Sequence, residues 1–109
     1  MAVFPAAVVL NVSDVGRAAN FWSQALGYVQ QQDAPAFLLP PNGEGLRLHL
    51  DDEDRTHLDL WVDAEHSDME TEVNRLVGLG ATRVHWVYPD NADFVVLADT
   101  EGNLFCVIK

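Results

Sequence analysis

Apolar and polar positions along the first half of the chain predict one helix among several strands. Apolar residues recur at helical spacing from Val15 to Leu26, Ser13 and Asp14 before them can cap a helix, and Gly27 is a stop signal. Runs of β-branched and alternating apolar residues surround this helix. The predicted strands are 6–12, 28–32, 36–39 and 46–51. This half is therefore predicted to run strand, helix, strand, strand, strand.

The second half shows the same order of patterns. Residues 56–62 alternate as a strand does, Ser67 is placed to cap a second helix, and Gly80 follows the last apolar position of that helix. The helix shows its apolar residues on one face: Met69, Val73, Leu76 and Leu79. The further predicted strands are 82–87, 94–98 and 103–108.

The two halves can be aligned as an internal repeat. Val8–Val12 aligns with Leu58–Val62, and Leu26–Tyr28 with Leu79–Ala81, at offsets that differ only by loop lengths. A small sheet with a helix on one face leaves its other face bare, so the halves are expected to pair as one curved mixed sheet around a cleft. The predicted fold is α+β: one domain over 1–109, with βαβββ modules at about 5–51 and 56–109. Pairing within one chain and exchange between two chains both satisfy this pattern.

Composition narrows the class of protein. A chain of 109 residues with 49% hydrophobic side chains can bury the core of one domain. Its 17 acidic and 6 basic side chains leave a formal charge of −11, which argues against nucleic acid or anionic membranes as partners. The same charge favours a cationic or amphiphilic small ligand, or simply keeps the protein soluble. A single cysteine and the lack of a leader or membrane-spanning pattern predict a cytoplasmic protein.

Several runs of residues, spread over essentially the whole chain, are similar to those of a known superfamily. They are Val9–Asp14, Ala19–Trp22, Ala25–Tyr28, His57–Val62 and Asp93–Cys106. The sequence resembles the glyoxalase, bleomycin-resistance and ring-cleaving dioxygenase (vicinal oxygen chelate) superfamily, and is closest to its small glyoxalase-like domains. The resemblance implies paired βαβββ modules, a homodimer and, in enzymatic members, a divalent metal ion in the cleft. It leaves the reaction open, because the superfamily includes lyases, isomerases, dioxygenases and drug-sequestering proteins.

The resemblance also implies where a metal would bind. Ligands of the superfamily come from the first and last strand of each module, positions that His49 and His57 occupy here. Ala7 and Cys106 stand where many members have histidine and glutamate. Two imidazoles and a thiolate form an acceptable zinc site, so the predicted metal ligands are His49, His57 and Cys106. The alternative is that the histidines are polar groups of the cleft wall and Cys106 is a small buried residue.

Strand alternation indicates a candidate ligand-binding face. His57, Asp59 and Trp61 share one face of their strand, opposite the apolar Leu58, Leu60 and Val62. A carboxylate beside an indole suits a cationic or aromatic ligand. The predicted ligand-binding residues are Arg47, Asp59, Trp61 and Trp86.

Each of these residues has an alternative role. Asp59 can pair with Arg47 or act as a general base, Trp61 can fill the cavity, and Trp86 can lie at a dimer contact. Phe21 and Trp22, on the first predicted helix, are expected in the core.

Two classes of function follow. In the first, the protein is a small-molecule-binding module with a degenerate metal site and no chemistry of its own. In the second, it is a metal-dependent lyase, isomerase or dioxygenase. The residues do not decide whether the protein is an enzyme, and they identify no cofactor outright, with zinc the ion that the donor types fit best.

Overall fold

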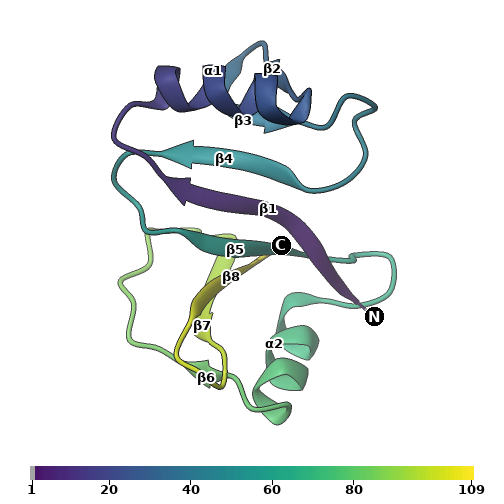
Figure 1. Ribbon diagram of the computed structural model, residues 1–109. Coiled ribbons are helices and arrows are strands. Elements are labelled where there is room, and N and C mark those ends of the chain that lie inside the picture. The colour runs from purple at the N-terminus through teal and green to yellow at the C-terminus, as the bar shows by residue number, and fades with distance from the viewer. Residues whose placement is uncertain (1) are drawn as a thin grey trace. The chain divides into compact units, whose positions relative to one another are not determined.

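The computed structural model describes residues 2–109, which form two compact units (Figure 1). The N-terminal unit is Ala6–Thr56. The C-terminal unit is His57–Lys109 together with residues 2–5. The second unit includes the start of the chain, where the carbonyl of Ala2 accepts a hydrogen bond from the backbone N–H of Asp63 at 2.7 Å.

The N-terminal unit has one helix and four strands. They are β1 (Val3–Asn11), α1 (Val15–Leu26), β2 (Val29–Gln31), β3 (Ala34–Leu39) and β4 (Arg47–Asp51), of which β1 belongs to this unit from Ala6 onward. The strands lie in the order β2-β3-β4-β1, with β1 and β4 parallel and the other pairs antiparallel. This unit is a βαβββ module, as predicted.

The C-terminal unit has the same organisation. Its elements are β5 (His57–Val62), α2 (Met69–Gly78), β6 (Thr82–Arg83), β7 (Phe94–Ala98) and β8 (Leu104–Ile108). The order is β5-β8-β7-β6, with β5 and β8 parallel. The predicted α+β fold of two βαβββ modules is confirmed.

Matching strand registers confirm the internal repeat. In the N-terminal unit Val9 lies opposite His49, and in the C-terminal unit Asp59 lies opposite Cys106. Asp59 is the repeat mate of Val9, and Cys106 is the third residue of β8 just as His49 is the third residue of β4, so the same pair of positions meets in both modules. In the C-terminal unit this register places the side chains of Asp59 and Cys106 next to each other.

Each module buries the face of its sheet that carries its helix. In the N-terminal unit Leu38, Leu48 and Leu50 are buried with Ala19 of α1. In the C-terminal unit the core is Val62, Val73, Leu97 and Val107. The expected alternation of β4 and β5 is therefore correct.

Leu58 is the exception on the apolar face of β5. It is more than a third exposed, because α2 packs over the other end of the strand, where Val62 lies.

The helix caps agree with the sequence patterns except at one residue. Asp14 accepts a hydrogen bond from the backbone N–H of Arg17 at 2.9 Å, and Gly27 ends α1 in the left-handed conformation. Asp68, and not the predicted Ser67, caps α2 by accepting from the backbone N–H of Thr71. Both residue types cap helices well, and here the Ser67 hydroxyl is used instead to donate to Glu72.

The strand predicted over 82–87 is wrong beyond Arg83. Residues 84–93 are irregular, and Trp86 and Val87 within them are exposed. The hydroxyl of Tyr88 accepts a hydrogen bond from the backbone N–H of Val96 at 2.8 Å. A side chain thus satisfies a backbone donor of β7 that a longer β6 would have faced.

Neither helix within residues 2–109 has the length and apolar character that crossing a membrane requires.

Gly80 and Gly78 offer a matched test of the turn after α2. Gly80 has a φ of +122°, and a Cβ there would lie 2.9 Å from Cγ2 of Thr100, whereas nothing lies within 4 Å of a Cβ on Gly78. We expect Gly80→Ala to lower the free energy of unfolding by about 1–3 kcal/mol and Gly78→Ala to raise it by about 0.5–1 kcal/mol. Urea denaturation measures both, and equal effects would contradict this reading of the turn.

Glu72 is expected to make the fold acid-sensitive. It is only 2% exposed and accepts hydrogen bonds from Ser67 Oγ at 2.7 Å and Arg75 Nε at 2.9 Å. The Ser67 hydrogen bond and then Arg75 hold the pKa of Glu72 below its usual value. A lowered folded-state pKa adds stability above the unfolded pKa of about 4.3, and that stability is lost as the pH falls through the folded-state pKa.

Glu72→Gln should therefore destabilise the protein at pH 7, and the difference from the wild type should shrink below about pH 4. Denaturation curves at both pH values measure this. The control is Glu70→Gln, since Glu70 is exposed on the first turn of the same helix. A destabilisation of the same size at both pH values would show that packing, and not charge, explains the role of Glu72.

Candidate metal and ligand site

Three potential metal ligands of the C-terminal unit lie together on β5 and β8. Asp59 and Cys106 are opposite each other in the parallel pair, and His57 precedes Asp59 by two residues and so shares its face. One ligand atom each from His57, Asp59 and Cys106 lies within 4.8 Å of the other two. The structure thus brings together two of the predicted metal ligands and adds Asp59, which had been predicted only to bind a ligand.

The distance between His57 and Asp59 fits two interpretations. Nε2 of His57 lies 3.2 Å from Oδ1 of Asp59, which suits an ion pair or hydrogen bond. Two ligands of a tetrahedral zinc ion, each about 2.0–2.1 Å from the metal, are about 3.3 Å apart, so the same separation suits coordination. The two side chains are only 8% and 16% exposed. Buried polar groups of this kind need partners, and either interpretation supplies them.

The donor types fit a zinc ion. An imidazole nitrogen, a carboxylate oxygen and a thiolate sulfur are all zinc ligands, and three protein ligands leave a fourth position for a small molecule. A thiolate and a carboxylate would together neutralise the double positive charge of the metal, which favours burial of the site. The residues present therefore fit a zinc ion.

His49, the third predicted metal ligand, belongs to the N-terminal unit and is held there by an aromatic stack. Its ring lies on Phe37, with centroids 4.1 Å apart and planes 11° from parallel. The guanidinium carbon of Arg47 lies 5.4 Å from the centroid of the same Phe37 ring. Nε2 of His49 is 3.9 Å from Oδ2 of Asp51. The participation of His49 in a metal site with His57 and Cys106 stays a prediction.

The two modules offer different donors at matching positions. The repeat mates of His57 and Asp59 are Ala7 and Val9, which have no metal-binding atoms. The N-terminal module therefore has one donor, His49, where the C-terminal module has three. A site with three ligands can be built within the C-terminal unit alone.

Aromatic residues lie along the same face of β5. Trp61 follows Asp59 at the next position of that face, and its ring meets Phe4 edge-on with centroids 5.9 Å apart. Phe4 itself is exposed. Trp86 lies in the irregular segment 84–93, so its predicted position near the end of a sixth strand is wrong. Its contact with a ligand, and that of Arg47, stay predictions.

A second group of potential ligands lies in the turn between β5 and α2. Asp63, Glu65 and His66 also place their ligand atoms within 4.8 Å of one another. Oδ2 of Asp63 lies 2.7 Å from Nδ1 of His66, and this hydrogen bond holds the pKa of Asp63 below its usual value. The His66 ring is largely exposed. Hydrogen bonds of Asp63 within the turn explain why these three residues lie close together.

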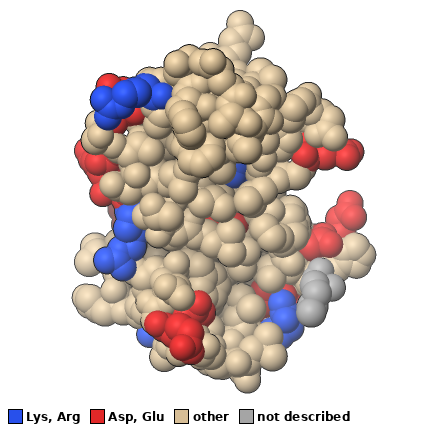
Figure 2. All heavy atoms as spheres, viewed as in Figure 1, with Lys and Arg blue, Asp and Glu red and all other residues tan. Residues whose placement is uncertain are grey.

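Acidic side chains form small separate groups on the face of the protein shown in Figure 2. Most of that face is made of uncharged residues. The excess of negative charge in the sequence therefore does not form one continuous acidic patch there.

Comparison with solved structures supports the fold. The chain resembles a structure described as the NAD-dependent benzaldehyde dehydrogenase from Legionella pneumophila, with a TM-score of 0.64, 16% identity, and coverage of 94% of this chain and 96% of that one. It also resembles methylmalonyl-CoA epimerase from Mycobacterium tuberculosis, with a TM-score of 0.60, 19% identity, and coverage of 95% and 85%. At these identities the likeness shows the fold alone.

Comparison of sequences identifies the family. No curated protein matches this chain significantly. Residues 7–108 match the sequence profile of the glyoxalase-like domain. The match covers nearly the whole chain and confirms the resemblance drawn from the residue runs. This protein therefore belongs to the glyoxalase-like domain family.

Proposed function

We propose that this glyoxalase-like domain binds a small molecule at a zinc ion held by His57, Asp59 and Cys106. The observation that supports the proposal is the meeting of imidazole, carboxylate and thiol donors within 4.8 Å on β5 and β8. These residues differ from the predicted set, since Asp59 takes the place given to His49. The predicted degenerate site, which lacks a ligand at Ala7 and has cysteine at position 106, stays part of this proposal, and one module supplies all three protein ligands.

The residues around the site have separate tasks in this proposal. Zinc, when bound, supplies a Lewis acid that polarises an oxygen atom of the bound molecule. Asp59 and Cys106 supply negative charge, and the parallel register of β5 and β8 holds them opposite each other. Trp61, on the same face as Asp59, offers an aromatic surface to the rest of the molecule. The ligand expected at such a site is small, carries an oxygen donor and has an apolar or aromatic part.

A metal-dependent lyase, isomerase or dioxygenase is the second candidate function. The observation that favours it is the number of ligands, because three protein ligands leave a coordination position where a substrate oxygen can bind. The similarity to the two solved structures does not indicate which of these reactions this chain would catalyse.

Zinc binding is the first test of the proposal. We expect the purified protein to bind one equivalent of zinc in calorimetry at pH 7.5 and to gain thermal stability from it, because a ligand that binds only the folded state stabilises it. Asp59→Asn and Cys106→Ala should each weaken zinc binding at least about 100-fold. His66→Ala removes a ligand of the exposed turn group and should leave the affinity unchanged.

Two results would contradict this proposal. One is an absence of zinc binding by wild-type protein that is folded by circular dichroism. The other is an equal loss of affinity in His66→Ala, which would place the ion at the turn. His49→Ala tests the original prediction separately: a change of less than about threefold supports the three residues of the C-terminal unit, whereas a loss as large as that of Cys106→Ala would restore His49 as a ligand.

Direct binding of a cation to Asp59 and Trp61, without metal, predicts a different result. In that case benzyltrimethylammonium should raise the melting temperature of metal-free protein, and Trp61→Ala should abolish the shift while Cys106→Ala keeps it. Trp86→Ala tests the predicted ligand contact of Trp86 separately: a lost shift would support that contact, and an unchanged shift would contradict it. If the compound produces a shift only after zinc is added, the metal-free mode is wrong and the zinc site is supported.

A further inference from the structure

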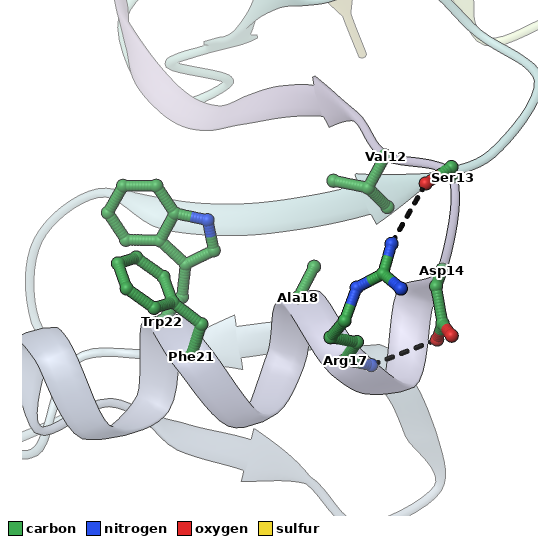
Figure 3. A pocket seen from close by; sticks show the side chains of 7 residues that line it. All are labelled: Val12, Ser13, Asp14, Arg17, Ala18, Phe21 and Trp22. Carbon is green, nitrogen blue, oxygen red and sulfur yellow. Dashed lines mark hydrogen bonds between the residues drawn. The ribbon is translucent and has the colours of Figure 1, made fainter.

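A hollow of about 390 Å³ lies on the N-terminal unit, where the chain leaves β1 and enters α1 (Figure 3). Its volume falls in the range of small-molecule sites. None of its residues takes part in the proposed zinc site. One side of it is apolar and the other polar, so it can be analysed as a separate binding site.

The apolar side is formed by two aromatic rings of α1 and smaller side chains beside them. Phe21 and Trp22 meet edge-on, with centroids 5.1 Å apart and planes 84° apart. Trp22 packs on the core of the unit as predicted, but Phe21 is 60% exposed, which corrects the expectation that both are core residues. The reason is the helical period, which turns neighbouring residues about 100° apart. The result is an aromatic ring left in water at the edge of the hollow.

The polar side is formed by Arg17 and its neighbours. The guanidinium of Arg17 donates a hydrogen bond to Oγ of Ser13 at 3.1 Å. Within residues 2–109 no carboxylate oxygen lies within 4.0 Å of this guanidinium; the Asp14 carboxylate instead accepts from the backbone N–H of Arg17 at 2.9 Å. The Arg17 guanidinium is therefore a positive charge that no carboxylate of the described chain neutralises by direct contact.

The polar and the apolar side of the hollow flank one small residue, Ala18. Figure 3 shows the Arg17 guanidinium on one side of Ala18 and the rings of Phe21 and Trp22 on the other, with Val12 above Ala18 in this view. Ala18 has only a methyl group, so nothing large separates the cation from the rings. A ligand lying across Ala18 would contact both.

We propose that this hollow binds a small aromatic carboxylate. Its ring would lie over Ala18 against Phe21 and Trp22, and its carboxylate would pair with Arg17. A carboxylate presents two oxygens in a plane, which matches the fork of a guanidinium. A single negative charge also limits the long-range repulsion by a chain of formal charge −11, which is twice as large for a dianion such as a phosphate monoester. The affinity expected for an open site of this kind is weak, about 0.1–1 mM.

An NMR titration with 2-naphthoate tests this proposal. We expect shifts at the amides of residues 12–22 and at the indole N–H of Trp22 in the ¹⁵N-labelled protein. Arg17→Gln should weaken binding about tenfold, since it removes a charge-assisted hydrogen-bonding pair. Arg83→Gln is the matched control: Arg83 is an exposed arginine of the C-terminal unit that donates to Asn74. Phe21→Ser should also weaken binding, without loss of stability, because Phe21 is mostly exposed.

Three outcomes would overturn the proposal. The first is an absence of shifts in residues 12–22 at about 5 mM probe, well above the expected dissociation constant. The second is equal binding of the neutral isostere 2-naphthamide, which would show that Arg17 recognises no charge. The third is a wild-type protein that does not bind the probe, combined with a Phe21→Ser variant whose oligomeric state differs from that of the wild type in sedimentation. That result would assign the hollow to contact between copies of the chain.

Discussion

Parallel pairing of the first and last strand within each module is the constraint on which the candidate site depends. Hydrogen bonds between β5 and β8 set Asp59 opposite Cys106, and the pleat of β5 then places His57 on the same face. A shift of one residue in this register would turn His57 and Asp59 toward the apolar face occupied by Val62, so the packing of α2 on that face protects the site as well as the core. The donor set is thus a consequence of burying the opposite side of the sheet.

The repeat explains why the C-terminal module brings three potential metal ligands together on its paired first and last strands, whereas the same strand positions of the N-terminal module do not. Both modules keep the same register, with Val9 opposite His49 and Asp59 opposite Cys106. The N-terminal copy has apolar residues at the positions of His57 and Asp59, and its remaining imidazole lies stacked on Phe37. Backbone geometry is therefore shared, while the chemistry is decided by a few side chains.

Most of the fold could be predicted from the sequence because it rests on local signals. Alternation along β4 and β5 showed which side chains share a face, and the aligned repeat predicted the order of elements in both modules. The position of Asp59 beside Cys106 was missed because it depends on which strands are neighbours. The strand after Arg83 was overestimated because the hydroxyl of Tyr88, and not a backbone carbonyl, accepts the N–H of Val96. A hydrogen bond from a backbone N–H to a side chain, in place of one to a neighbouring strand, cannot be recognised from the pattern of apolar and polar residues.

Charge distribution connects the two proposed sites and separates their ligands. A chain with a formal charge of −11 attracts cations in general, yet binding requires donors that converge, as His57, Asp59 and Cys106 do. The same charge repels anions at long range, so an anionic ligand can be held only where a cation is close and not already neutralised. Arg17 meets that condition, because its guanidinium bonds to a hydroxyl and no carboxylate of the described chain reaches it. In both proposals, local contacts therefore decide whether the site binds a cation or an anion. The overall charge of the chain affects mainly the rate at which the ligand associates.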